Sequence, residues 1–199
     1  MSEESRAQEI EDLKSSIREC NDCEIQEWHT PCVFGSQDSK ILIVSERPPK
    51  GEYEKELGKQ MAEGTLEKEP RFCQKNWLDI SGHFSPKHFF WIHRANCFSD
   101  YYEQCSCKFL EKAIRLVRPK LMLIFGGVAA EYFFPAERRV IDLVNRGKLV
   151  YRRHGISTEC RVLFHWSREN LRLETDPAYK RAHQTSITEA RALVREVYT

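Results

Sequence analysis

The stretch that decides the fold of this chain is KILIVSERP, residues 40–48. It begins with a short apolar run rich in β-branched residues and ends in a proline-containing turn. This pattern predicts a buried strand over 40–44 with a functional loop at its carboxyl end. Three further apolar runs predict strands of the same kind, at 88–93, 121–125 and 161–165.

Segments with helical spacing of apolar residues lie between these runs. They are 5–19, 109–117, 128–134 and 178–197. Strands that alternate with helices indicate a parallel sheet covered on both faces, because a parallel connection needs a crossover. We therefore predict one domain over 1–199, a three-layer α/β/α fold around a central, mainly parallel, four-stranded sheet.

A single candidate site follows from this topology. The carboxyl ends of parallel strands meet at one edge of the sheet, where such folds bind their ligands. Four segments end or turn there: 45–48, 93–97, 126–127 and 165–167. We expect their side chains to converge.

The composition indicates a globular chain. Of the 199 residues, 41% are hydrophobic and 31% are charged, and no apolar run approaches the roughly 20 residues that cross a bilayer. The opening MSEESRAQEIEDLK is acidic and does not resemble a secretory signal. We expect a cytoplasmic, reducing location and no membrane partner, so the eight cysteines should be ligands or buried thiols.

Charge is distributed unevenly. Residues 138–199 hold 13 Lys and Arg against 7 Asp and Glu, although the net charge of the whole chain is only +1. Arginine suits bidentate contacts with phosphate, so this half could face a polyanion. A solvated surface is an equally good interpretation of the charge alone.

Four cysteines have the spacing of a metal centre. Cys20 and Cys23 form a CxxC pair, Cys97 follows the second predicted strand, and Cys105 or Cys107 precedes a predicted helix. Thiolates are soft ligands that suit iron-sulfur clusters and zinc. The pattern predicts a metal cluster.

In the order and spacing of its motifs the chain resembles the iron-sulfur branch of the uracil-DNA glycosylase superfamily, often called family 4. The resemblance runs from Cys20 to about Arg172. The matching segments after the CxxC pair are Val33-Phe34-Gly35, Ser45-Glu46-Arg47-Pro48, Gly58-Lys59-Gln60-Met61, Cys97, Phe109-Leu110, Leu116 to Lys120, Leu123 to Gly126, Arg146-Gly147 and His165-Trp166-Ser167.

The resemblance implies a [4Fe-4S] cluster held by Cys20, Cys23, Cys97 and Cys107, with Cys105 as the alternative fourth ligand. A zinc ion on the same thiolates is the alternative cofactor. The cluster is expected to be structural. The three remaining cysteines outside this set, Cys32, Cys73 and Cys160, are predicted to be buried thiols.

The resemblance also implies an activity, the hydrolysis of the N-glycosidic bond of a nucleotide flipped out of DNA. Glu46 is the candidate carboxylate beside the sugar, and His165 is the candidate donor to the departing base. Ser167 is placed to hold a phosphate. Trp166, Arg168 or Arg172 is expected to fill the gap left by the flipped nucleotide.

Three positions depart from the family pattern and change the predicted base. His93 stands where the family reads uracil with asparagine, and Met61 replaces the phenylalanine on which uracil stacks. Arg47 replaces a glycine of the first motif. These changes favour a monofunctional enzyme, acting as a monomer, that removes a modified pyrimidine and leaves an abasic site.

A bulky phage-borne cytosine is one option for that base, which would make the chain an antiviral enzyme. Three other functions stay open at this point. They are ordinary uracil repair, a non-catalytic iron-sulfur protein that binds DNA, and a zinc-stabilised interaction domain unrelated to DNA.

Overall fold

The fold is known from a computed structural model that describes residues 3–22, 33, 35, 37–47, 88–96, 102–137, 139–153 and 155–199. At 3, 102 and 166–170 only the backbone is described. Three of the sequence-predicted site residues, Cys23, Met61 and Cys97, lie outside the described residues.

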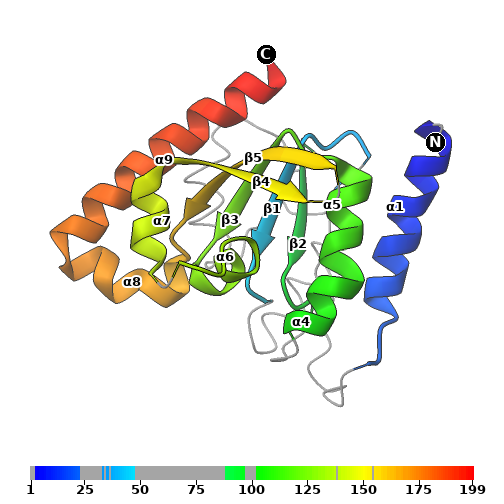
Figure 1. The fold of residues 1–199 in the computed structure, drawn as a ribbon, viewed down its shortest axis with the longest axis horizontal. Helices are drawn as coiled ribbons and strands as arrows, with labels where there is room; N and C mark the ends of the chain where they lie inside the picture. Colours follow the sequence, from blue (N-terminus) through cyan, green and yellow to red (C-terminus); the bar gives the residue numbers. More distant parts are fainter. Residues whose placement is uncertain are drawn as a thin grey trace, which may run out of the picture.

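The described residues form an α/β fold with a five-stranded, mostly parallel sheet in the order β2-β1-β3-β5-β4 (Figure 1). Four strands are mutually parallel, and β4 pairs antiparallel with β5 at one edge. The strands are β1 Ile41–Ser45, β2 Phe89–His93, β3 Leu121–Phe125, β4 Lys148–Arg153 and β5 Ile156–Leu163.

The predicted count of four strands was therefore wrong, because β4 was missed. Its sequence, KLVYRR, has too few apolar residues to resemble a buried strand, and its burial alternates because one face is open to solvent. Gly155, with φ at +74°, allows the tight turn from β4 into β5. The partner strand β5 consequently begins at Ile156, five residues before the predicted start.

Helices surround the sheet at the predicted places, with extensions. The π-helical turn η3 and the short helix α4 extend the predicted 109–117 helix toward the N-terminus, and α7 and α8 were not predicted. The helices are α1 Glu3–Arg18, α4 Tyr102–Cys105, η3 Ser106–Leu110, α5 Glu111–Val117, α6 Gly127–Phe133, α7 Val140–Arg146, α8 Trp166–Thr175 and α9 Pro177–Tyr198. Within the described part of the chain, none is long and apolar enough to cross a membrane.

Apolar side chains cover both faces of the sheet. On one face, Leu42 and Val44 of β1 join a cluster with residues of α1, α5 and α6. On the other face, Ile41 and Ile43 pack in a second cluster with Ile187 and neighbouring residues of α9. Figure 1 shows α1 beside α5 on one side and α9 running along the other. Because successive strand residues point to opposite, covered faces of the sheet, the polar residues that could act on a ligand lie at the ends of the strands.

Candidate active site at the strand ends

Polar residues follow the carboxyl ends of the parallel strands, as predicted. The backbone ladder between β1 and β2 continues past both strands: the amide of Arg94 donates to Ser45 O at 2.8 Å, and that of Ala95 donates to Glu46 O at 3.0 Å. These bonds hold the backbone of Glu46 in register with the segment after β2. Glu46 therefore occupies a fixed position at the sheet edge.

Glu46 is buried, with 4% of its surface exposed. Its Oε1 lies 3.5 Å from Nε of the neighbouring Arg47, which forms an ion pair with it. A carboxylate removed from water needs a charged or hydrogen-bonding partner. Arg47 therefore contacts the candidate catalytic carboxylate, and the base contact predicted for it stays a prediction.

His165 follows β5 and packs against Gly126 at the end of β3. The Gly126 amide donates to Leu163 O at 2.8 Å, and φ of Gly126 is +83°. A Cβ at position 126 would lie 2.9 Å from the Cβ of His165, closer than real atoms approach. Glycine at this position is what lets His165 lie over the end of β3.

Glu46 and His165 lie on either side of β3, because β1 and β5 are separated by that single strand. Two interstrand spacings set their backbones about 10 Å apart. Gly126, at the end of the strand between them, contributes no side chain to that space. A buried carboxylate and a buried imidazole thus lie on either side of the end of β3, where residue 126 is a glycine.

His93 is connected to two neighbours through one hydroxyl. The indole nitrogen of Trp91 donates to Ser45 Oγ at 2.8 Å, and Ser45 Oγ lies 2.8 Å from His93 Nδ1. Because an indole N–H only donates, the serine hydroxyl accepts from Trp91 and has its own proton for His93 Nδ1. We assign the serine proton to the bond with His93 Nδ1, and with this assignment the single proton of the neutral imidazole is on Nε2.

The Nε2 atom of His93 is buried and has no hydrogen-bond partner among the described residues. Burial, and secondarily the charge of His165, lower the pKa of His93 to about 3. The imidazole is therefore neutral near pH 7. It presents a single unpaired N–H donor on the same side of the molecule as His165.

Two residues of this site were not predicted from the sequence. Asn96 accepts a hydrogen bond from the His93 amide through Oδ1 at 3.2 Å, and its Nδ2 has no partner among the described residues. Arg94 is 4% exposed, and its Nη1 donates to Val128 O of α6 at 2.6 Å. Arg94 also pairs with Glu103 of α4, so it ties the end of β2 to two helices.

A signal for these two residues existed in the sequence. Both stand between the strand-ending His93 and Cys97, in a polar segment that a buried strand delivers to the sheet edge. What the sequence could not supply was the direction of each side chain. Asn96, like His93, has a buried nitrogen without a partner among the described residues, and this nitrogen could donate a hydrogen bond to a ligand.

The predicted DNA contacts lie on α8, which begins directly after His165. Trp166, Ser167 and Arg168 form its first turn, and only their backbone is described. A helix N-terminus at this place has free amides that suit a phosphate. Arg172, further along, donates to Tyr179 Oη of α9 at 2.9 Å and stacks on that ring.

The structure brings two of the predicted cysteine regions together. Cys20, just after α1, has its Sγ 3.7 Å from Nζ of Lys108 in η3. Lys108 also pairs with Asp22, so the chain after α1 is held against η3. The thiols of Cys20 and of the 105–107 segment thus come from neighbouring parts of the fold.

Cys105 and Cys107 differ in their surroundings. Cys105 is buried and Cys107 is exposed, and both flank or lie in the π-helical turn η3. π-Turns within helices are frequent at functional sites. No group of three possible metal ligands occurs in the described ranges, from which Cys23 and Cys97 are missing. The fourth ligand stays open between Cys105 and Cys107.

Cys160 lies in the core, as predicted for a buried thiol. It has no exposed surface, and its Sγ donates to Thr158 O at 3.4 Å. Burial raises the pKa of this thiol to about 12. Cys160 is therefore an inert core residue, whereas Cys32 and Cys73 lie outside the described residues.

Some arginines of the C-terminal half form ion pairs with carboxylates. Arg139, Arg146 and Arg153 pair with Asp142, Glu137 and Glu111 respectively. Such pairs form a solvated, partly neutralised surface. The excess of positive charge in residues 138–199 consequently gives little support for a continuous polyanion-binding face. A search of the chain against protein-family models found no match.

Proposed function

We propose that the chain is a monofunctional DNA glycosylase that removes a modified pyrimidine from a flipped-out nucleotide and leaves an abasic site. The proposal includes the finer fold assignment, a single uracil-DNA glycosylase-like domain with three α/β/α layers. One observation carries it: Glu46 and His165 are both buried at the carboxyl ends of β1 and β5, on either side of β3 and of Gly126 at its end.

The chemistry needs one group at each end of the scissile bond. As the bond from C1′ to the base nitrogen breaks, positive charge develops on the sugar and negative charge on the base. Glu46 stabilises the sugar cation and orients a water molecule, and His165 donates a hydrogen bond to the base oxygen. The water adds hydroxide to C1′, and its proton ends on the departing base.

Arg47 and Gly126 position these two groups. The ion pair with Arg47 holds the Glu46 carboxylate at the end of β1. Gly126 allows His165 to approach the end of β3. Such preorganisation matters because a group that is misplaced by about 1 Å can lose two orders of magnitude in rate.

His93 supports the choice of a cytosine-derived base. Its Nε2–H can donate to N3 of cytosine, whereas N3 of uracil carries a proton and cannot accept. This proton is on Nε2 when the hydroxyl of Ser45 donates to Nδ1, as assigned above. Bulky cytosines, such as those carried by phages, are thus the preferred class of substrate, and ordinary uracil repair is the alternative.

The candidate cysteine ligands have the chemistry that a cluster needs, and two of the chain segments that contain them are neighbours in the fold. Cys20 and the 105–107 segment are neighbours through Lys108, and four thiolates are the usual ligands of a [4Fe-4S] cluster. Cys20, Cys23, Cys97 and Cys107, or Cys105 in its place, would hold it. The group would pin the chain after α1 to η3, beside the DNA path. Zinc on the same thiolates is the alternative.

The test is a panel of DNA duplexes that carry uracil, hydroxymethyluracil, hydroxymethylcytosine or glucosylated hydroxymethylcytosine at one position. Purified protein is incubated with each duplex, and abasic sites are detected by alkaline strand cleavage. We expect cleavage at a modified cytosine. Cleavage at uracil alone would instead support ordinary repair.

A non-catalytic protein is distinguished in the same experiment. It would bind the duplexes, measured by fluorescence anisotropy, without releasing any base. An interaction domain unrelated to DNA would neither bind nor cleave. Release of a modified base that also occurs with Glu46→Gln would contradict the roles assigned here.

A further inference from the structure

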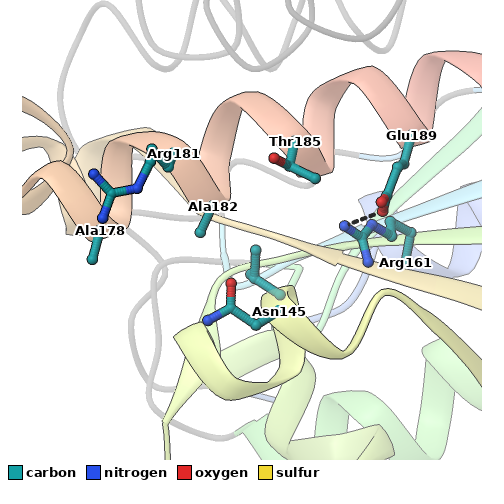
Figure 2. A pocket seen from close by; sticks show the side chains of 8 residues that line it. Asn145, Arg161, Ala178, Arg181, Ala182, Thr185 and Glu189 are labelled. Carbon is teal, nitrogen blue, oxygen red and sulfur yellow. Dashed lines mark ion pairs between the residues drawn. The ribbon is translucent and has the colours of Figure 1, made fainter.

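A pocket lies between α7, α9 and β5, with a volume of about 330 Å³ (Figure 2). This volume falls within the range of small-molecule sites. Helix α9 contributes residues at helical spacing along the pocket, among them Arg181, Thr185 and Glu189. Asn145 of α7 lines the opposite side.

Arg161 of β5 is the unusual residue of this pocket. It is 2% exposed, yet its Nε and Nη1 have no hydrogen-bond partner among the described residues. Its Nη2 pairs with Glu189 Oε2 at 2.5 Å. Figure 2 shows the guanidinium extending from β5 into the space between α7 and α9. A buried cation with unmade hydrogen bonds is costly unless another acceptor satisfies them.

The lining defines the ligand that would fit. Two arginines and one glutamate give the pocket a net positive charge. The unpaired N–H groups of Arg161, the Asn145 amide and the Thr185 hydroxyl can together donate more hydrogen bonds than the two oxygens of a carboxylate can accept. A phosphate group offers more oxygens and suits arginine well.

We propose that this pocket binds a small phosphate-bearing molecule, with its phosphate against Arg161 and the rest of it along α9 toward Arg181. The pocket is separate from the candidate active site, because Arg161 precedes His165 by four residues, or about 13 Å along an extended chain. The proposal therefore does not depend on the glycosylase activity.

Binding is measured by isothermal titration calorimetry with three probes: inorganic phosphate, a deoxynucleoside 5′-monophosphate and the matching uncharged deoxynucleoside. We expect both phosphate probes to bind and the deoxynucleoside to fail. Tighter binding of the monophosphate than of inorganic phosphate identifies an ester as the ligand, and equal binding identifies the free anion. Binding of the deoxynucleoside as tight as that of the monophosphate overturns the proposal.

Substitutions locate the binding. Arg181→Ala and Asn145→Ala change exposed side chains, so the fold should survive, and each should weaken phosphate binding about tenfold. Arg195→Ala, on the same helix outside the pocket, is the matched control and should have no effect. Equal loss in Arg195→Ala and Arg181→Ala would mean that the probe senses only general charge, and the proposal would fail.

Glu189→Gln provides a test with the opposite sign. This substitution removes a negative charge from the wall while leaving an oxygen that can accept from Nη2 of Arg161, so phosphate should bind several-fold more tightly. Unchanged or weaker binding in a folded Glu189→Gln protein contradicts the proposed position of the phosphate beside Arg161. A chain that binds single-stranded DNA through these residues, but neither phosphate probe, also overturns it.

Discussion

Gly126 and His165 are in contact across the ends of β3 and β5, so closely that a side chain at position 126 would overlap the histidine. We expect Gly126→Ala to slow base release at least about tenfold, because the added methyl displaces the imidazole. It should also cost about 1–2 kcal/mol of stability, since φ of +83° is unfavourable for alanine. Single-turnover base release and thermal unfolding measure the two effects.

The neighbouring Gly127→Ala is the matched control. A Cβ at that position would lie 3.7 Å from the nearest atom, in Val140, which is an ordinary contact. It should leave base release unchanged and stabilise α6 slightly. Equal losses in both variants would show that His165 is not displaced by the substitution at Gly126.

Ser45 is expected to control base choice through His93. In Ser45→Ala the proton of His93 is no longer directed to Nε2, so discrimination between modified cytosine and uracil should fall about tenfold. The variant should also lose about 1–3 kcal/mol, because the buried Trp91 N–H loses its hydrogen bond to Ser45 Oγ. The measurement is the ratio of base-release rates on the two substrates.

Trp91→Phe separates these two effects. It removes the indole donor but leaves the hydrogen bond between Ser45 and His93 intact. Stability should fall while the ratio of rates is kept. His93→Asn should instead shift preference toward uracil, and a variant with unaltered base choice would refute a reading role for His93.

Stability should depend on pH through His93. Its folded-state pKa of about 3 lies below the ordinary value of 6.5 because of burial and the nearby His165. Between these two values only the unfolded chain binds the proton, so stability falls as pH falls. The expected loss is about 2 kcal/mol between pH 7 and pH 5.

Urea unfolding at several pH values checks this dependence. In His93→Asn the loss between pH 7 and pH 5 should shrink by the same amount, whatever the stability of the variant at pH 7. A wild-type protein and a variant with parallel pH curves would show that folding does not lower the pKa of His93.

The cysteines give a prediction about metal content. Cys20→Ser should lower bound iron and acid-labile sulfide, because one of four thiolates is removed. Of Cys105→Ser and Cys107→Ser, one should lose the cluster and the other keep it. Cys160→Ala, which changes a buried thiol of the core, should retain it. Iron content equal in all four variants would contradict a cluster at these thiols, and zinc in place of iron would identify the alternative.

The sequence predicted those parts of the fold that depend on apolar periodicity. The runs at 41–45, 89–93 and 121–125 became parallel strands because burial on both faces requires continuous apolar residues. β4 was not predicted because an edge strand with one open face can contain charged residues such as Lys148 and Arg152. The strand conformation of β4 depends on its pairing with β5, and a local sequence pattern does not reveal that pairing.

The candidate site was predictable in position and less so in detail. Topology placed Glu46, His93 and His165 at one sheet edge. The contacts that define their chemistry, such as Ser45 with His93, depend on register between strands 48 residues apart. Arg161 shows the same limit: its arginine side chain suggested surface charge, whereas the fold buries it beneath α9.

The most direct test of the account is single-turnover base release from DNA with glucosylated hydroxymethylcytosine by wild type, Glu46→Gln and His165→Gln. The account predicts release by the wild type, and a loss of about 10²–10³-fold in each variant with DNA binding unchanged. Release by either variant at the wild-type rate, or no release of any base by the wild type, would contradict it.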